Sequence, residues 1–300
     1  FFPKGRISEV QRRQMTTIGR PNIHPIAITG DFDDCQALVK QMFNDFKFRD
    51  QVRLTGVNSI NWARVLCQIV YYFVSAVALG APKQKISFSV PTGNFGDIFA
   101  GYVAKKMGLP IDKLVLATNE NDILHRALQT GAYEKRGVMQ TMSPSMDIQV
   151  ASNFERILFD TCERQPEQVV ELMDKLARDG HFALNSKILN RMRSDFSSCS
   201  VTESQTAATI RDISHSLHKL VCPHTAVGIF AAEKMKSTNS KMITLATAHP
   251  AKFPEAVKSC TGVTPELPKK YYDIYTKEEN LTCASTDLTE IKQIICERIL

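Results

Sequence analysis

Short apolar runs alternate with amphipathic stretches along the chain, and this alternation predicts an α/β fold with a layered sheet. We expect core strands at 86–90, 114–117 and 242–246, with a helix after each of the first two. The apolar positions between Ile60 and Val77 predict one broad buried helix face. The apolar stretch 65–79 contains Gln68 and Ser75 and is shorter than the ~20 apolar residues of a bilayer span, so a membrane helix is not expected.

Helix starts are indicated by three Ser/Thr residues that have a Gln or Glu three positions later, the spacing of a capping box. The pairs are Ser8 with Gln11, Ser152 with Glu155, and Thr202 with Gln205. Beyond residue 131 the pattern is mainly helical, with helices expected near 153–163, 167–178, 203–218, 225–236 and 288–298.

The domain organisation predicted from this pattern has two parts. Residues 1–55 fit the remainder of a smaller α/β domain, and residues 56–300 fit a large domain with a helical C-terminal part. The opening Phe1-Phe2-Pro3-Lys4-Gly5 resembles the end of a core strand, so we expect the sequence to be a piece of a longer protein.

Composition narrows the function classes. Hydrophobic residues make up 43% and charged residues 23%, which is ordinary for a globular protein. The net charge of +6 is scattered, which suits a small anionic ligand and disfavours nucleic acid. The eight cysteines form no CxxC pair, so reduced thiols in the cytoplasm are expected rather than disulfides or a metal site.

A glycine-containing turn, Gly93-Asn94-Phe95-Gly96, stands between a predicted strand and a predicted helix. Glycines let backbone N–H groups converge, and a helix N-terminus adds unpaired N–H groups and a positive dipole end. Together these favour a phosphate site, although an ordinary tight turn fits the spacing equally well. No Walker lysine follows the turn and the chain has no GxGxxG, so nucleotide binding is disfavoured.

A second candidate is Thr247, which follows the last predicted strand directly. Ligands of open α/β sheets gather at the carboxyl ends of strands, so Thr247 and the glycine turn could face one cleft. A threonine hydroxyl there can bond a heteroaromatic nitrogen, whereas spacing alone favours a plain helix N-cap.

These segments together resemble one family. The run Ser-Val-Pro-Thr-Gly-Asn-Phe-Gly-Asp at 89–97, continued by 100–102 and 105–111, closely resembles the phosphate-loop region of threonine synthases. Further matching segments follow the family's order along most of residues 1–260, namely 2–8, 57–62, 143–148, 223–228 and 246–253.

The resemblance implies the tryptophan-synthase-β-like fold, fold type II of the pyridoxal 5′-phosphate enzymes, incomplete at its N-terminus. In that family the loop matching Gly93, Asn94, Phe95, Gly96 and Asp97 binds the cofactor phosphate. The residue matching Thr247 contacts the pyridine nitrogen. A hydroxyl partner leaves that nitrogen largely unprotonated, which favours elimination and replacement over transamination.

The implied reaction converts O-phospho-L-homoserine and water to L-threonine and phosphate. The lysine that bonds the cofactor and moves protons belongs to a segment preceding these residues, because Lys4, Lys40 and Lys47 lack the family's Phe-Lys-Asp context. No catalytic residue is therefore assigned, and the chain alone is expected to be inactive.

Substrate contacts are expected from four residues near the loop: Asn58, Ser59, Asn61 and His249. Helix capping explains Asn58 or Ser59 equally well, and most single histidines are structural. Arg64 and Lys252 are better explained as solvated surface charges than as ligands of the substrate phosphate.

Two alternatives to a threonine synthase stay open. One is a truncated, non-catalytic protein that binds phosphorylated ligands or a partner, and the other is a dehydratase of the same fold. The sequence leaves the choice between monomer and homodimer undetermined.

Overall fold

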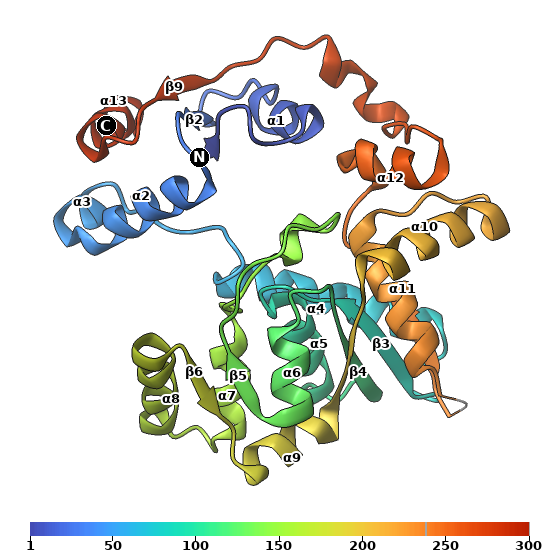
Figure 1. Cartoon of the computed structure of the whole chain (residues 1–300). Helices are drawn as coiled ribbons and strands as arrows, with labels where there is room; N and C mark the ends of the chain where they lie inside the picture. Colours follow the sequence, from blue (N-terminus) through green and yellow to red (C-terminus); the bar gives the residue numbers. More distant parts are fainter. Residues whose placement is uncertain (238, 300) are drawn as a thin grey trace. The chain divides into compact units, whose positions relative to one another are not determined.

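The structure, a computed structural model, describes residues 1–237 and 239–299, which fall into two compact units (Figure 1). The larger unit is Val57–Pro265, and the smaller unit combines Phe1–Gly56 with the residues from Glu266 onward. The expected division into 1–55 and 56–300 differs from these units at its C-terminal end. The reason is that a late strand, β9 (Thr282–Ala284), pairs with β2 (Ile26–Ile28) of the smaller unit.

The larger unit is built on a four-stranded parallel sheet of order β7-β4-β3-β8. Its strands are β3 (Ile86–Pro91), β4 (Ile111–Thr118), β7 (Phe196–Ser200) and β8 (Lys241–Thr244). Among the described residues, a two-stranded antiparallel ribbon of β5 (Ala132–Glu134) and β6 (His181–Ala183) completes the β structure of this unit.

Side-chain alternation buries both faces of this sheet. On β4, Leu114 and Leu116 belong to the main core, whereas Val115 and Ala117 pack with Val227 on the other face. Helices therefore cover both faces, as a parallel sheet requires.

The helices of the larger unit follow the alternating pattern in the first half and dominate the second. They are α4 (Trp62–Ala78), α5 (Gly96–Lys106), α6 (Ile123–Thr130), α7 (Phe154–Thr161), α8 (Pro166–Asp179), α9 (Ser186–Asp195), α10 (Glu203–Leu217), α11 (Pro223–Met235) and α12 (Pro254–Thr261), with short 3₁₀ turns η1 (Pro144–Met146) and η2 (Pro250–Lys252). Figure 1 shows α5 and α6 in the green region, between the strands of the sheet and the ribbon.

The apolar face predicted for α4 is only partly buried. Val65, Ile69, Tyr72 and Ala76 are buried at helical spacing. Several other apolar side chains of the same helix are exposed, and these include Leu66, Val70, Val74 and Val77. The prediction of one broad buried face was therefore wrong, because α4 is apolar around most of its circumference and only one side packs on α5.

The smaller unit is a three-stranded parallel sheet of order β1-β2-β9, with β1 at Phe2–Pro3. Its helices are α1 (Glu9–Thr16), α2 (Phe32–Asn44), α3 (Phe46–Gln51) and α13 (Leu288–Ile299), with the 3₁₀ turn η3 (Lys269–Tyr275). Ile28, Leu38, Met42 and Ile291 contribute to its core.

Two of the three capping-box predictions are confirmed and one is wrong. Capping boxes are present at Ser8 with Gln11 and at Thr202 with Gln205. The box predicted at Ser152 was wrong, because α7 begins one residue later and Asn153 occupies its N-cap without a side-chain cap bond. No helix among the described residues is both long and apolar enough to cross a membrane.

Candidate functional site

The glycine turn predicted at 93–96 connects β3 to α5 as expected. The sheet continues to Thr92, whose N–H donates to the Ala117 carbonyl at 2.8 Å. Phe95 then takes the left-handed conformation, with φ 64°, and stands at the N-cap position of α5. A non-glycine residue in this region is uncommon and costs backbone strain, so the bend is imposed by its surroundings.

The backbone amides of this bend are not used by the protein. In the described part of the chain, no N–H group from Gly93 to Asp97 donates to a protein acceptor. The last two of these groups also belong to the first turn of α5, where the helix dipole is positive. The bend therefore presents a row of unsatisfied donors suited to an anion.

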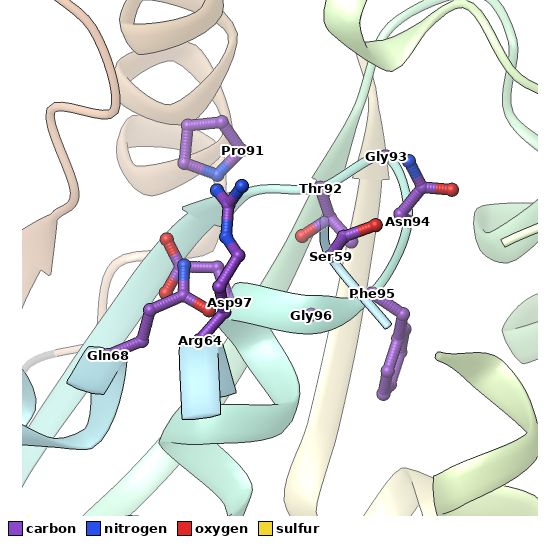
Figure 2. Close-up of a pocket in the computed structure, with 10 residues that line it drawn as sticks. All are labelled: Ser59, Arg64, Gln68, Pro91, Thr92, Gly93, Asn94, Phe95, Gly96 and Asp97. Carbon is purple, nitrogen blue, oxygen red and sulfur yellow. The ribbon is translucent and has the colours of Figure 1, made fainter. Parts of the chain in front are cut away.

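A cavity of about 120 Å³ opens over these amides (Figure 2). Pockets for whole drug-sized ligands span about 300–1,000 Å³, so this cavity suits one end of a ligand, such as a phosphate group. Its lining consists of Ser59, Arg64, Gln68 and the continuous run Pro91–Asp97. Figure 2 shows Arg64 extending from α4 toward the end of β3, so the cavity has a cation in its wall.

Asp97 also lines the cavity, yet its carboxylate is occupied by α4. Its Oδ1 accepts hydrogen bonds from the Tyr71 hydroxyl at 2.6 Å and from the Tyr72 hydroxyl at 3.0 Å. Burial raises the pKa of Asp97, against the opposing effect of these bonds and of the Arg64 charge. A carboxyl group that accepts bonds from two hydroxyl donors repels an anion less than a free carboxylate does, so Asp97 is compatible with a phosphate beside it.

Phe95 and Asn94 fix the bend from the opposite side. The buried Phe95 ring packs against Phe154 and Phe196, with centroid separations of 5.6 Å to each. The Asn94 carbonyl accepts from the Asn153 N–H at 3.0 Å and from its side-chain amide at 3.1 Å. In Figure 2 the Phe95 ring points away from the cavity, so Phe95 can meet a ligand there only through its backbone.

The turn η1 forms a wall behind the glycine turn. A Cβ added to Gly93 would lie 2.8 Å from the Ser145 carbonyl oxygen and 3.2 Å from the Met146 Cα. Only glycine allows this close approach of two backbones. The identity of Gly93 is thus explained by packing as well as by ligand access.

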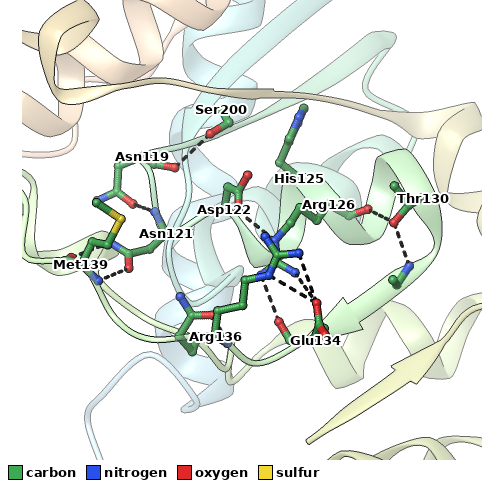
Figure 3. A network of polar contacts seen from close by, with 12 residues as sticks. Asn119, Asn121, Asp122, His125, Arg126, Thr130, Glu134, Arg136, Met139 and Ser200 are labelled. Atoms are coloured by element: carbon green, nitrogen blue, oxygen red, sulfur yellow. Dashed lines mark hydrogen bonds and ion pairs between the residues drawn. The ribbon is translucent and has the colours of Figure 1, made fainter.

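Side-chain amides from the end of β4 anchor this wall. The Asp147 Oδ1 accepts from Asn119 at 2.8 Å, from Asn121 at 2.9 Å and from the Thr141 hydroxyl at 2.6 Å. Figure 3 shows the Asn121 side chain beside the backbone of Met139, with which it exchanges two hydrogen bonds of 2.8 and 2.9 Å. The loop that carries Ser145 is therefore held to the carboxyl edge of the sheet.

Thr247 leaves the sheet at the same edge from the neighbouring strand. β8 pairs with β3 in parallel, with Thr244 opposite Ser89, and the Leu245 N–H continues the ladder to the Ser89 carbonyl. Thr247 lies three residues beyond β8 and is exposed. It is not among the residues that line the cavity.

Of the four residues predicted to contact substrate, one lines the cavity and three make local backbone hydrogen bonds. Ser59 lines the cavity. Asn61, and not Asn58 or Ser59, caps α4 by accepting the Ala63 N–H at 2.8 Å. His249 caps η2, with Nδ1 accepting the Ala251 N–H at 3.2 Å. Asn58 is exposed, and its Oδ1 accepts the Ile60 N–H at 3.3 Å.

Sequence reasoning missed several contributors to this site. Arg64 is exposed, as its interpretation as a surface charge implies, but it also lines the cavity. Gln68 lines the cavity too, and Tyr71 bonds Asp97 from the same helix. Arg64, Gln68 and Tyr71 are spaced four and three residues apart, so the sequence could have indicated that they share one face of α4. Nothing in the sequence showed that the start of α5 packs against this face. Within the described residues, no cluster of His, Cys, Asp or Glu is arranged to hold a metal ion.

Comparison with known proteins finds similarity to threonine synthases. A family model described as threonine synthase, C-terminal, matches residues 225–295. The threonine synthase of Pseudomonas aeruginosa is 49% identical over 299 residues, which cover 99% of this chain and 64% of that protein.

Solved structures show the same similarity. The crystal structure of PLP-bound threonine synthase from Brucella melitensis superposes with a TM-score of 0.96 at 52% identity, covering 99% of this chain and 64% of that one. Yeast threonine synthase gives a TM-score of 0.90 at 40% identity, covering 99% of this chain and 63% of that one.

The parallel sheet, the glycine turn before α5 and these superpositions define the chain as having the fold of the fold-type II pyridoxal-phosphate enzymes. The fold predicted from the sequence is thus confirmed. Within this class the chain is similar to threonine synthases along nearly its whole length. It spans 64% of the length of the Pseudomonas and Brucella proteins, which is less than two thirds.

Proposed function

We propose that this chain forms the cofactor-phosphate site of a pyridoxal-phosphate-dependent threonine synthase. The observation that carries the proposal is the row of unbonded N–H groups from Gly93 to Asp97, which opens into a cavity at the start of α5. A phosphate dianion satisfies such donors and benefits from the helix dipole. The P. aeruginosa relative, which is 49% identical, is a threonine synthase, and this supports the proposed reaction.

The residues present fit the phosphate end of pyridoxal phosphate. Backbone amides provide the donors, and Arg64 supplies the positive charge in the wall. Gly93 leaves no side chain between the bend and the Ser145 backbone, so the bend keeps its shape without obstructing the cavity. We assign Gly93, Asn94, Phe95, Gly96 and Asp97 to phosphate binding, with Phe95 and Asp97 acting through their backbone N–H groups.

Thr247 is proposed to contact the ring nitrogen of the cofactor. This assignment is supported by the pairing of β8 with β3, which brings both segments to one edge of the sheet. When bound, the cofactor supplies an electron sink for bonds broken at the amino-acid substrate. A neutral hydroxyl at position 247 would orient the ring without protonating it.

The complete protein is proposed to convert O-phospho-L-homoserine and water to L-threonine and phosphate. The residue that bonds the cofactor covalently is expected on a lysine segment preceding the residues described here. Ser59 is the best placed of the four substrate candidates, because it lines the same cavity as the glycine turn.

Binding of pyridoxine 5′-phosphate to the 300-residue chain tests the phosphate site directly. This compound has no aldehyde, so surface lysines cannot capture it covalently. Titration calorimetry should show at least 10-fold tighter binding than for pyridoxine, which lacks the phosphate. Equal affinities for the two compounds would refute the site.

Activity needs a separate test. A protein that joins this chain to its lysine segment should release inorganic phosphate from O-phospho-L-homoserine and form L-threonine in equal amounts. Binding of pyridoxine 5′-phosphate without any phosphate release would instead support the non-catalytic ligand-binding alternative.

A further inference from the structure

His224 is a buried side chain beside the candidate site to which neither the sequence nor the proposed function assigns a role. It is the second residue of α11 and is only 4% exposed. Its Nε2 accepts the Ser145 N–H at 3.2 Å, and its ring packs against the Phe253 ring with centroids 4.7 Å apart. The imidazole therefore touches two segments that are far apart in the sequence.

The hydrogen bond fixes the protonation of this ring. An Nε2 atom that accepts must lack a proton, so the neutral ring carries its proton on Nδ1. Burial, together with the charge of Lys252, lowers the pKa of His224 to about 4. Nδ1 is buried and has no hydrogen-bond partner among the described residues, so the single bond to Ser145 is the one that orients the ring.

The segment bonded by His224 is the wall behind the glycine turn. Ser145 donates its N–H to His224, while its carbonyl oxygen lies against Gly93. One residue of η1 is therefore connected to His224 through its N–H and to the anion-binding bend through its carbonyl oxygen. A loss of the His224 bond would free the wall to move away from Gly93.

The segment packed on the other side of the ring follows Thr247. Phe253 directly follows η2, and His249 caps that turn by accepting the Ala251 N–H. α11 itself lies close to the strand ends, because a Cβ on Gly228 would meet Thr244 at 2.9 Å and Pro91 at 3.0 Å. The helix that carries His224 thus contacts the last residues of both β3 and β8.

We propose that His224 is a positioning residue that holds the Ser145 turn against the glycine loop and braces the segment after Thr247. One side chain would then set the spacing between the phosphate end and the ring end of the cofactor site. The inference rests on the proposed function for the identity of the ligand, but its structural part can be measured without any ligand.

The competing explanation is a histidine that only fills core volume. An apolar side chain of similar size would then serve equally well. Three substitutions separate the two explanations. His224→Gln can place an acceptor oxygen near the position of Nε2, His224→Asn places one near Nδ1, and His224→Leu removes the acceptor while retaining bulk.

Hydrogen exchange followed by mass spectrometry on the ligand-free chain is the test. In His224→Leu and His224→Asn, exchange in the peptide covering 143–147, which includes the Ser145 N–H that donates to His224, should accelerate about 10-fold. His224→Gln should restore most of the protection. The α8 peptide and the exposed-site variant His181→Leu serve as internal and external controls. If His224→Leu does not fold, the contrast between the Gln and Asn variants decides.

Binding supplies the second readout. His224→Asn should weaken pyridoxine 5′-phosphate about 10-fold relative to His224→Gln. Unchanged exchange in the 143–147 peptide, or no difference between the Gln and Asn variants, overturns the inference. If the His224 variants change exchange as expected but the wild-type chain does not bind pyridoxine 5′-phosphate, the positioning role of His224 is upheld and the proposed ligand is rejected.

Discussion

The Tyr71 hydroxyl of α4 donates a hydrogen bond of 2.6 Å to the Asp97 carboxylate at the start of α5. This bond joins α4 to α5 through Asp97, which lines the cavity, and directs its acidic side chain toward hydroxyl donors. Because Asp97 is partly buried and loses hydration, its ionised form costs free energy even with these donors, and its pKa is raised.

Asp97→Asn should change the pH dependence of stability. The folded protein holds the Asp97 proton more strongly than the unfolded chain does, so the wild type loses stability as pH rises from the ordinary Asp pKa through the raised one. Asparagine retains an acceptor for Tyr71 and does not ionise. The free energy of unfolding of the variant, measured by urea denaturation, should therefore improve relative to wild type as pH rises through that window.

Asp160→Asn is the matched control with the opposite sign. Although partial burial acts to raise it, the pKa of Asp160 is lowered by hydrogen bonds from Tyr102 and Arg164. Wild type should gain stability over this variant as pH rises through the lowered pKa toward the ordinary Asp value. Parallel pH profiles for the two variants would contradict both assignments.

Gly93→Ala should damage both stability and anion binding. Its Cβ would lie 2.8 Å from the Ser145 carbonyl oxygen, which is backbone and cannot rotate away. Overpacking of this kind costs about 1–3 kcal/mol. Gly137→Ala, whose Cβ would meet nothing within 4 Å, is the control and should change the free energy of unfolding by less than about 0.5 kcal/mol. Similar urea midpoints for the two variants would show that the η1 wall yields easily.

Thr247→Val should weaken pyridoxine 5′-phosphate binding about 5- to 10-fold, because it removes the hydroxyl proposed for the ring nitrogen, a bond of about 1 kcal/mol. Thr247→Ser keeps the hydroxyl and should bind nearly as wild type does. Inorganic phosphate, which needs only the glycine turn, should bind equally to all three proteins in calorimetry. A parallel loss of phosphate affinity in Thr247→Val would place position 247 at the phosphate end instead.

Asp147→Ala should lower the free energy of unfolding by about 2–4 kcal/mol, because the amides of Asn119 and Asn121 lose a shared acceptor in a buried setting. The exposed Asp174→Ala is the control and should be close to neutral. Thermal unfolding followed by circular dichroism measures both. A nearly unchanged melting temperature for Asp147→Ala would mean that water replaces the carboxylate without cost.

The strand-helix order of the first half could be predicted because each element carries a local signal. In 86–90, apolar and serine positions alternate, and the structure places Phe88 in the main core while Ser89 bonds the Gly228 carbonyl at 2.7 Å. The glycine turn was recognisable for the same reason, since a strand, two glycines and a helix are close in sequence.

The strand β7 was not predicted, because Phe196-Ser-Ser-Cys-Ser has little apolar content. Ser198 is buried there through partners from another helix. Its hydroxyl lies 2.9 Å from His125 Nδ1 and accepts the Gln129 side-chain amide at 3.1 Å. A polar strand of this kind is stable only when distant donors satisfy it, and no local pattern reveals them.

The amino-acid sequence by itself determined two of the three predicted capping boxes, the strands β3, β4 and β8, and a bend that contains two glycines, because capping and alternation act over a few residues. Tertiary structure alone decided that the bend's amides stay unbonded, that Tyr71 and Arg64 face Asp97, and that β9 joins the smaller unit. These relationships depend on which distant segments pack together, and that choice is made by the whole core rather than by any local stretch.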